Sequence, residues 1–235
     1  MILNDTLNVR KKEKQALAKE SEVAQQQIEI RKAAQEEIVA KVKKKQKKYS
    51  SQIKKKQRAE RKIDKKIEKI IRDAIAKSNR SSSKKSSRFV MTAEAKLSAK
   101  KFEENKGKLP WPVSTGRVTQ EFGKQRHATI PGIYTNSSGV KILTSKNSDV
   151  KAVFNGVVSE IQMIKGANQS VYIQHGNYFT VYSNLKNLRI KKGDKVITGM
   201  PIGKIATNNE GKSVLRFFIF NNSKKQNPAH WIYKM

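Results

Sequence analysis

The stretch SVYIQHGNYFTVYSNL, residues 170–185, places two apolar and aromatic segments on either side of Gly176. Both segments are rich in β-branched and aromatic residues, which favour strands. Further short segments of this kind, separated by glycines, occur at VKIL (140–143), VKAVF (150–154), GVVSEIQMI (156–164), IGKIA (202–206) and VLRFFIF (214–220). Several of them alternate apolar with polar residues, as a sheet with one solvated face requires. The pattern predicts an antiparallel β-sandwich or open barrel over residues 107–235.

The first part of the chain has a different composition. Residues 1–77 contain no glycine and no proline and are rich in Lys, Glu, Gln and Ala, which is typical of a long helix or coiled coil. An apolar seam at 4-3-4 spacing is predicted from Ile63, Ile67, Ile70 and Ala74, and Lys56 interrupts it. Because isolated helices depend on packing an apolar face, we expect this region to need a partner helix from this chain or another.

Two short regions connect these parts. Residues 78–90 begin with SNRSSSKKSSR, which has no apolar side chain and predicts a flexible linker. Residues 91–106 predict a short helix with Thr92 as its N-cap and a stop at Gly107. The expected fold class is therefore α+β and multidomain, with an N-terminal long helix or coiled coil followed by an antiparallel β domain.

Composition removes several classes of function. The 235 residues include no cysteine, which excludes disulfides, a thiol nucleophile and thiolate metal sites. The three histidines, His127, His175 and His230, are far apart and do not form a metal-binding spacing. No apolar run approaches the roughly 20 residues that span a bilayer, and no secretory signal precedes the helical region. We therefore expect either a cytoplasmic protein or a chain that begins after its natural start.

The net charge of +32 is spread over both parts of the chain. Lysine-rich runs are usually solvated, the lysines of the helical region are not interleaved with aromatic stacking residues, and no nucleic-acid-binding signature occurs. We therefore expect no nucleic-acid partner. Attraction to anionic cell-wall polymers or phospholipid head groups is compatible with this charge and would depend on salt.

The order of motifs in the second half resembles a known family. LPWPVSTGRVTQEFG, SGVKI, VKAVFNGVV, VYIQHGNYFTVYSNL, IKKGDKVITGMPIGKI and VLRFFIF with NPAHWI follow one another over residues 109–235. This series is similar to the LytM-type (lysostaphin-like) peptidoglycan endopeptidase domain. Active members hold a zinc ion through a histidine and an aspartate of an H-x-G-I-D-I stretch and the second histidine of a late H-L-H motif.

The resemblance places the three ligand positions on Ser137, Lys141 and Arg216. Two ligands are thereby replaced by cations that have no lone pair to donate and that repel Zn²⁺. The resemblance also places the two assisting histidines on Asn184, within a stretch that begins at Tyr182, and on Val214. We therefore expect no metal, no cofactor and no peptidase activity, and a structural role for His175.

A helical region followed by a degenerate LytM domain is similar to the EnvC-type murein hydrolase activators. The resemblance implies a non-catalytic activator of a peptidoglycan N-acetylmuramoyl-L-alanine amidase in cell division, in the periplasm or cell envelope. It implies that the former zinc groove, lined by Ser137, Lys141, Tyr182, Asn184, Val214 and Arg216, binds a partner helix. It also implies that the coiled coil couples to a membrane-embedded, transporter-like division complex, and that a helical arm can cover the groove at rest. The alternative is a cell-wall-binding or division scaffold that acts through its coiled coil and basic surface.

Overall fold

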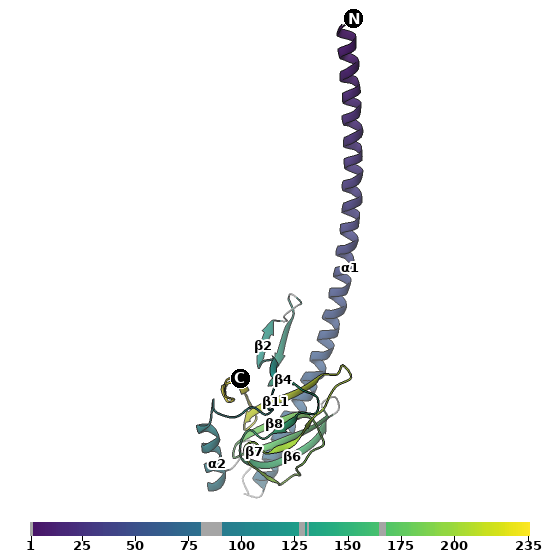
Figure 1. The fold of residues 1–235 in the computed structure, drawn as a ribbon. Helices are drawn as coiled ribbons and strands as arrows, with labels where there is room; N and C mark the ends of the chain where they lie inside the picture. Colours follow the sequence, from purple (N-terminus) through teal and green to yellow (C-terminus); the bar gives the residue numbers. More distant parts are fainter. Residues whose placement is uncertain (1, 81–90, 127–129, 131, 165–167) are drawn as a thin grey trace. The chain divides into compact units, whose positions relative to one another are not determined.

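A computed structural model describes residues 2–80, 91–126, 130, 132–164 and 168–235. Their contacts divide the chain into two compact units, residues 1–54 and residues 55–235. The second unit contains the β domain together with the last part of the long helix. The expected long helix followed by an antiparallel β domain is confirmed (Figure 1).

The long helix α1 runs from Ile2 to Arg80. Its sequence lacks the two residues that most disfavour helix interiors, and i,i+4 pairs such as Glu37–Lys41 (2.5 Å) support it. The helix includes residues 78–80, which we expected to begin the linker, and the rest of that linker, residues 81–90, lies outside the described residues. Among the described residues, no helix is long and apolar enough to cross a membrane.

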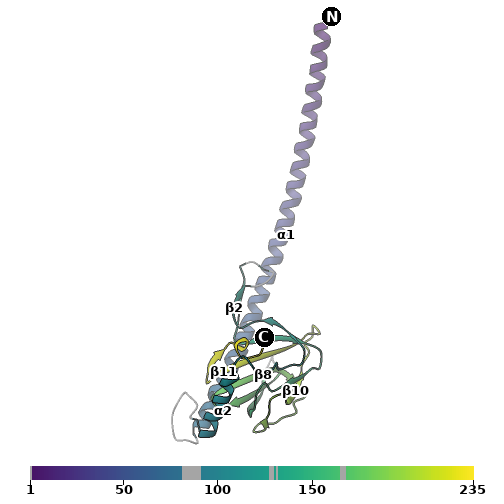
Figure 2. The ribbon, with the colours of Figure 1, turned by 60° about the vertical axis from the view of Figure 1, so that its left-hand side comes forward.

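The short helix α2 spans Ala93–Glu104. As predicted, Thr92 is its N-cap, and the Thr92 hydroxyl accepts a hydrogen bond from the Ala95 backbone N–H at 3.2 Å. Its C-terminal end is closed by Asn105, whose N–H bonds the last carbonyls. Figure 2 shows α2 beside the β domain, where its Phe102 side chain is completely buried.

The described residues of the β domain form twelve strands and one short 3₁₀ helix. Its elements are β1 (Arg117–Gln120), β2 (Gly123–Arg126), β3 (Tyr134–Ser137), β4 (Val140–Thr144), β5 (Asp149–Lys151), β6 (Gly156–Ile164), β7 (Asn168–His175), β8 (Tyr178–Lys186), β9 (Lys195–Val196), β10 (Pro201–Ile205), β11 (Ser213–Asn221), β12 (Lys224–Gln226) and η1 (Pro228–His230). The predicted segment 150–154 is a strand only as far as Lys151. Beyond that point the Val153 N–H bonds the Tyr182 hydroxyl instead of a strand (2.9 Å).

Ten strands form one antiparallel sheet in the order β1-β4-β11-β8-β7-β6-β9. Strand β10 pairs with β5 and β8, β12 pairs with β11, and β2 with β3 forms a separate two-stranded sheet. The long central strands β7, β8 and β11 are buried on both faces, so they read as nearly continuous apolar runs. The sheet therefore needs a cover on each side.

On one side, the main core includes α2 and an aromatic cluster around Phe102. The Phe102 ring stacks on His175 with centroids 4.7 Å apart and packs against Trp231 at 4.9 Å. At the turn between β7 and β8, Gly176 has φ +68°, and a Cβ there would lie 2.3 Å from the Ala95 carbonyl oxygen. Glycine thus allows both the turn and the close approach of α2.

Candidate functional site: a cationic face covered by the end of helix α1

The site is centred on two neighbouring cations of the sheet. Arg216 of β11 lies directly opposite Lys141 of β4 in the antiparallel register. Residues opposite each other share a face, and two like charges in that position are unfavourable unless an anion lies between or beside them. This face of the sheet therefore favours an acidic occupant.

The last part of α1, within the same compact unit, supplies the acids. Glu60 pairs with Lys141, the Asp64 carboxylate accepts a hydrogen bond from Arg216 at 2.7 Å, and Glu68 pairs with Lys225 of β12 at 2.7 Å. The three acids are four residues apart, so they follow one another along one side of the helix. Each of them meets a different cation of the sheet.

Apolar side chains lie beside these ion pairs. The buried isoleucines of this segment are Ile63, Ile67, Ile71 and Ile75, and they pack against Tyr172, Phe179, Val181, Phe218 and Phe220 of the sheet. The predicted seam at Ile70 and Ala74 is wrong in register, because those two side chains are only partly buried. The spacing is four throughout, which follows an i±4 ridge across a sheet and not the 4-3 seam of a helix–helix contact.

A repeat in the sequence carries this pattern. Residues 60–71 read ERKIDKKIEKII, in which an acid is followed three residues later by isoleucine, three times in succession. The heptad spacing alone does not reveal this repeat, in which the acids and the isoleucines each recur every four residues. We expected a helix as the partner of this region, but for this segment the partner is a sheet of the same chain. Residues 7–49 keep several exposed apolar side chains.

Asp64 and Arg216 form the most buried of the three pairs. Their side chains are 11% and 13% exposed, and the Arg216 guanidinium lies 5.5 Å from the centre of the Phe218 ring. Desolvation by burial raises the pKa of Asp64, and the Arg216 charge opposes this shift. A buried pair of this kind stabilises little by itself, but losing one partner is costly.

Tyr172, which belongs to the same apolar cluster, also carries a polar group. Its hydroxyl is buried and has no hydrogen-bond partner among the described residues. Burial, with a smaller contribution from the Glu160 charge, raises the pKa of Tyr172. An unsatisfied buried hydroxyl costs roughly 1–3 kcal/mol, so the covered state of this face is less stable than its apolar contacts suggest.

The other predicted groove residues are placed differently. Val214 lies two residues from Arg216 on β11 and is partly buried. Ser137, at the end of β3, donates a hydrogen bond to the Gly139 carbonyl at 2.8 Å. Tyr182 does not line a groove, because its side chain is fully buried in the main core and burial raises its pKa to about 12.

Asn184 has a structural role in the sheet. It adopts φ +77°, which asparagine tolerates better than most residues, and its amide donates to the Val214 carbonyl (2.8 Å) and to the Ala206 carbonyl (3.0 Å). Its side-chain oxygen accepts from Asn168 at 2.6 Å. These bonds tie β8 to three neighbouring segments, at Asn168, Ala206 and Val214, and leave the amide engaged.

The residues at the three implied zinc positions do not fit the metal. Lys141 and Arg216 are cations engaged with carboxylates, and the Ser137 hydroxyl is bound to a backbone carbonyl. Zinc sites in proteins use imidazole, thiolate or carboxylate groups. In the part of the chain that the structure describes, no three His, Cys, Asp or Glu side chains gather as a metal site would require.

His175 is buried in the main core. Its Nδ1 lies 2.6 Å from the Asn155 carbonyl oxygen and its Nε2 lies 2.9 Å from the Thr180 hydroxyl. Burial lowers its pKa to about 4. This arrangement agrees with the structural role that we expected, whereas His127 lies outside the described residues.

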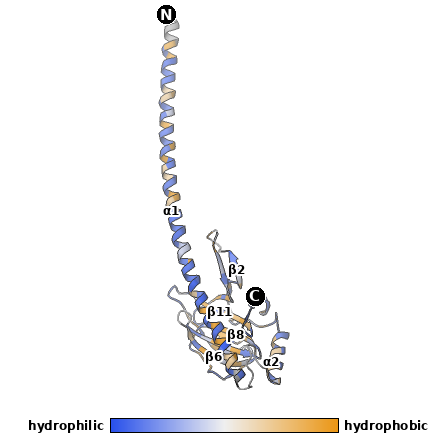
Figure 3. Cartoon of the chain, turned by 180° about the vertical axis from the view of Figure 1, so that it is seen from behind, coloured by the Kyte–Doolittle hydropathy of each residue, from blue (hydrophilic) through white to orange (hydrophobic). Residues whose placement is uncertain are grey.

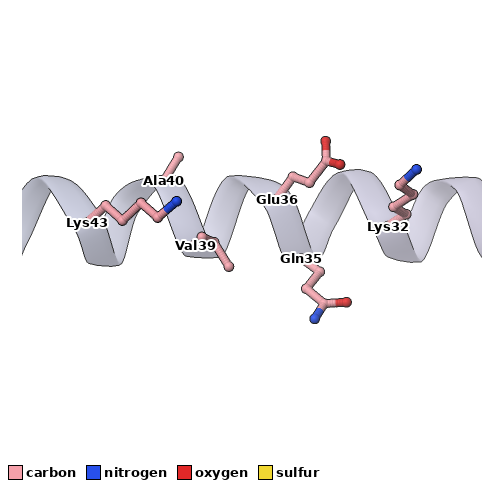
Figure 4. A pocket seen from close by; sticks show the side chains of 6 residues that line it. All are labelled: Lys32, Gln35, Glu36, Val39, Ala40 and Lys43. Atoms are coloured by element: carbon pink, nitrogen blue, oxygen red, sulfur yellow. The ribbon is translucent and has the colours of Figure 1, made fainter.

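Two hollows occur elsewhere on the described surface. One, of about 300 Å³, lies near the start of the β domain and is lined by Val118, Glu121, Phe122, Val140, Asn227, Ala229 and Met235. The other lies along α1 and is lined only by residues of that single helix, as Figure 4 shows. Neither contains any of the six predicted site residues.

Comparison with known proteins identifies the class of the β domain. Residues 135–228, which include Ser137, Lys141 and Arg216, match the family model described as Peptidase family M23. The chain therefore carries an M23-type, or LytM-type, domain behind a long helix, as its motifs predicted.

Two curated proteins are similar to this chain. One is an uncharacterized protein of Neisseria meningitidis serogroup B, 28% identical over 138 residues, and the other is the murein hydrolase activator EnvC of Escherichia coli K12, 25% identical over 129 residues. The matches cover 57% and 54% of this chain but only 22% and 29% of those proteins. This chain thus corresponds to less than a third of either relative.

Solved structures with a similar fold include Csd3 of Helicobacter pylori and a zinc-containing peptidase from Vibrio cholerae. Csd3 is 24% identical with a TM-score of 0.47, and the match covers 54% of this chain and 35% of Csd3. The Vibrio cholerae peptidase is 22% identical with a TM-score of 0.45, and the match covers 52% of this chain and 39% of the peptidase.

Proposed function

We propose that this protein is a non-catalytic activator of a peptidoglycan N-acetylmuramoyl-L-alanine amidase in cell division. The observation that carries the proposal is the cationic face at Lys141 and Arg216, where an M23 enzyme of the resembled type would hold zinc ligands. The similarity to the activator EnvC supports the same function. Such an activator would work in the periplasm or cell envelope.

In this proposal the sheet face binds a helix of the amidase. The end of α1 indicates what such a helix needs, because it occupies the face with isoleucines beside Glu60 and Asp64. Helix-in-groove recognition uses apolar anchors at helical spacing, and the two cations add selectivity for acidic partners. The amidase helix and the end of α1 would then compete for one surface, so α1 restrains the activator at rest.

The part of α1 that precedes Ile38 provides a second surface. We propose that it couples to a membrane-embedded, transporter-like division complex through a coiled coil, as the resemblance implies. Movement of that complex would draw the end of α1 away from the sheet.

A binding experiment tests the proposal. Ile67→Asp places a charge in the apolar contact and should release the end of α1, so this variant should capture the amidase more strongly than the wild-type chain does. Arg216→Glu added to Ile67→Asp should abolish the gain. Ile30→Asp, at an exposed position of α1, is the matched control and should bind as the wild type does.

Two results would refute the proposal. Cleavage of purified muropeptide cross-links by the chain with added zinc would make it an enzyme. Equal amidase capture by wild type, Ile67→Asp and the Arg216→Glu double variant would favour a scaffold that acts through its helix and overall basic charge.

A further inference from the structure

A segment of α1 in the first compact unit has an unusual distribution of charge. Between Ile38 and Lys54 the chain contains seven lysines and no acidic residue. The lysines are Lys41, Lys43, Lys44, Lys45, Lys47, Lys48 and Lys54. Several are three or four residues apart, so like charges adjoin along the helix and destabilise it unless an anionic partner neutralises them.

The large apolar side chains of the same segment share one side of the helix. With about 100° of rotation per residue, Ile38, Val39, Val42, Tyr49 and Ile53 fall within an arc of about 100°. The seven lysines occupy the rest of the circumference. Figure 4 shows the start of this arrangement, with Gln35 and Val39 on one side of the helix and Glu36 and Ala40 on the other.

Most of these apolar side chains are exposed in the structure, and Ile53 is partly buried. Ile38, Val42 and Tyr49 are 60%, 56% and 52% exposed. Figure 3 shows α1 as a largely hydrophilic helix with scattered hydrophobic positions. A basic amphipathic helix of this kind is typical of segments that lie on a membrane surface.

We propose that the segment Ile38–Lys54 binds anionic phospholipid surfaces, lying along the head-group layer with its apolar arc toward the acyl chains. The proposal concerns a site distinct from the sheet face and does not depend on the amidase function. The lysine ammonium groups would contact lipid phosphates, and the alkyl chains of the lysines would extend from the sides of the apolar arc toward the head-group layer. The length of this segment is about 24 Å.

Charge and apolarity together favour this occupant. A second copy of the segment would bring seven further lysines with no acid to meet them, and charged flanks decide helix pairing. A nucleic acid or an anionic glycopolymer would neutralise the lysines but would leave the apolar arc exposed to water. An anionic lipid layer would both neutralise the lysines and bury the apolar arc.

Co-sedimentation of the full chain with vesicles tests the proposal. Vesicles of phosphatidylcholine mixed with phosphatidylglycerol should bind the chain, and vesicles of phosphatidylcholine alone should bind it far more weakly. Because each lysine near an anionic membrane contributes about fivefold in affinity, Lys43→Gln, Lys44→Gln and Lys47→Gln together should weaken binding about 100-fold. Lys108→Gln, Lys191→Gln and Lys195→Gln, three exposed positions of the second unit, form a control with the same net charge and should bind nearly as the wild type does.

The apolar arc is tested separately. Val42→Asn with Tyr49→Asn keeps every lysine and should weaken binding by about tenfold or more, since two buried apolar side chains are lost. A Tyr49→Trp variant should show a blue shift of fluorescence on anionic vesicles only.

Four outcomes would overturn the proposal. The first is equal binding to both kinds of vesicle, and the second is equal weakening by the control triple variant. The third is weakening by the lysine variants but not by Val42→Asn with Tyr49→Asn, and this third outcome would indicate a polyanion ligand. The fourth is a dimer in sedimentation analysis that Val42→Asn dissociates, which would assign the apolar arc to a second copy.

Discussion

Arg216 Nη2 donates a hydrogen bond to Asp64 Oδ1 at 2.7 Å, although 152 residues separate them in the chain. The pair joins the end of α1 to the centre of the β domain, at a position that the resemblance to LytM-type enzymes assigns to a zinc ligand. Its energetics decide whether α1 can leave the sheet.

The first prediction is that Arg216→Met alone loosens α1. It leaves the Asp64 carboxylate buried without its cation, which should cost about 3 kcal/mol of docking free energy. Adding Asp64→Leu should recover most of the loss, because an apolar pair has no charge to desolvate. Hydrogen exchange of the amides in residues 60–75 measures the effect, and Arg189→Met, which affects an exposed pair with Asp149, is the control.

Failure of the double variant to recover would contradict this account of the pair. It would mean that Arg216 supports the sheet itself, independently of Asp64.

The second prediction concerns Glu60 and Lys141, which are more exposed at 32% and 21%. Solvent screens this pair, so Glu60→Lys should loosen α1 by only about 1 kcal/mol. Exchanging both charges, Glu60→Lys with Lys141→Glu, should restore slow exchange of the same amides. If the exchanged pair behaved like the single variant, Glu60 would not act through Lys141.

The third prediction tests the apolar contact. Ile71→Ala removes a fully buried side chain and should weaken docking by about 2–4 kcal/mol, because the sheet side chains cannot close the resulting cavity. Ile30→Ala, at a position that is 70% exposed, should change little. Similar exchange rates for Ile71→Ala and wild type would place the isoleucines outside the docking contact.

The fourth prediction is a pH dependence of stability. The pKa of His175 is about 4 in the folded protein, below the ordinary value of 6.5 that applies to the unfolded chain. The unfolded chain therefore takes up the proton first as the pH falls. The free energy of unfolding should therefore be highest above about pH 6.5 and should fall by about 3 kcal/mol as the pH approaches 4. Urea unfolding across this range measures it, with exposed His230→Gln as a control that keeps the slope and His175→Phe as the variant that reduces it.

The β domain was largely predictable because its strands are short, apolar and separated by glycines. Residues 156–164 and 214–220 are strands as expected, and Thr92 caps α2. The docking of α1 was not predictable in the same way, since contacts between Asp64 and Arg216 depend on distant segments. The acid-x-x-Ile repeat of residues 60–71 was nevertheless visible in the sequence and would have shown that the helix packs at spacing four.

The site was predicted in part. Lys141 and Arg216 do lie together, because adjacent antiparallel strands place them in register. Tyr182 was expected on the same surface, but pairing with Phe217 puts its ring among the main core side chains. Motif matching alone gave no information on which face of the sheet each side chain occupies.

We propose that the chain activates an amidase through the face that α1 covers. The direct test of this proposal is release of dye from labelled peptidoglycan by the purified amidase. Wild type, Ile67→Asp and the double variant of Ile67→Asp and Arg216→Glu are each added in a separate reaction. We expect no dye release by the chain alone, stronger stimulation of the amidase by Ile67→Asp than by wild type, and loss of stimulation in the double variant. Dye release by the chain without amidase, or equal stimulation by all three proteins, would contradict it.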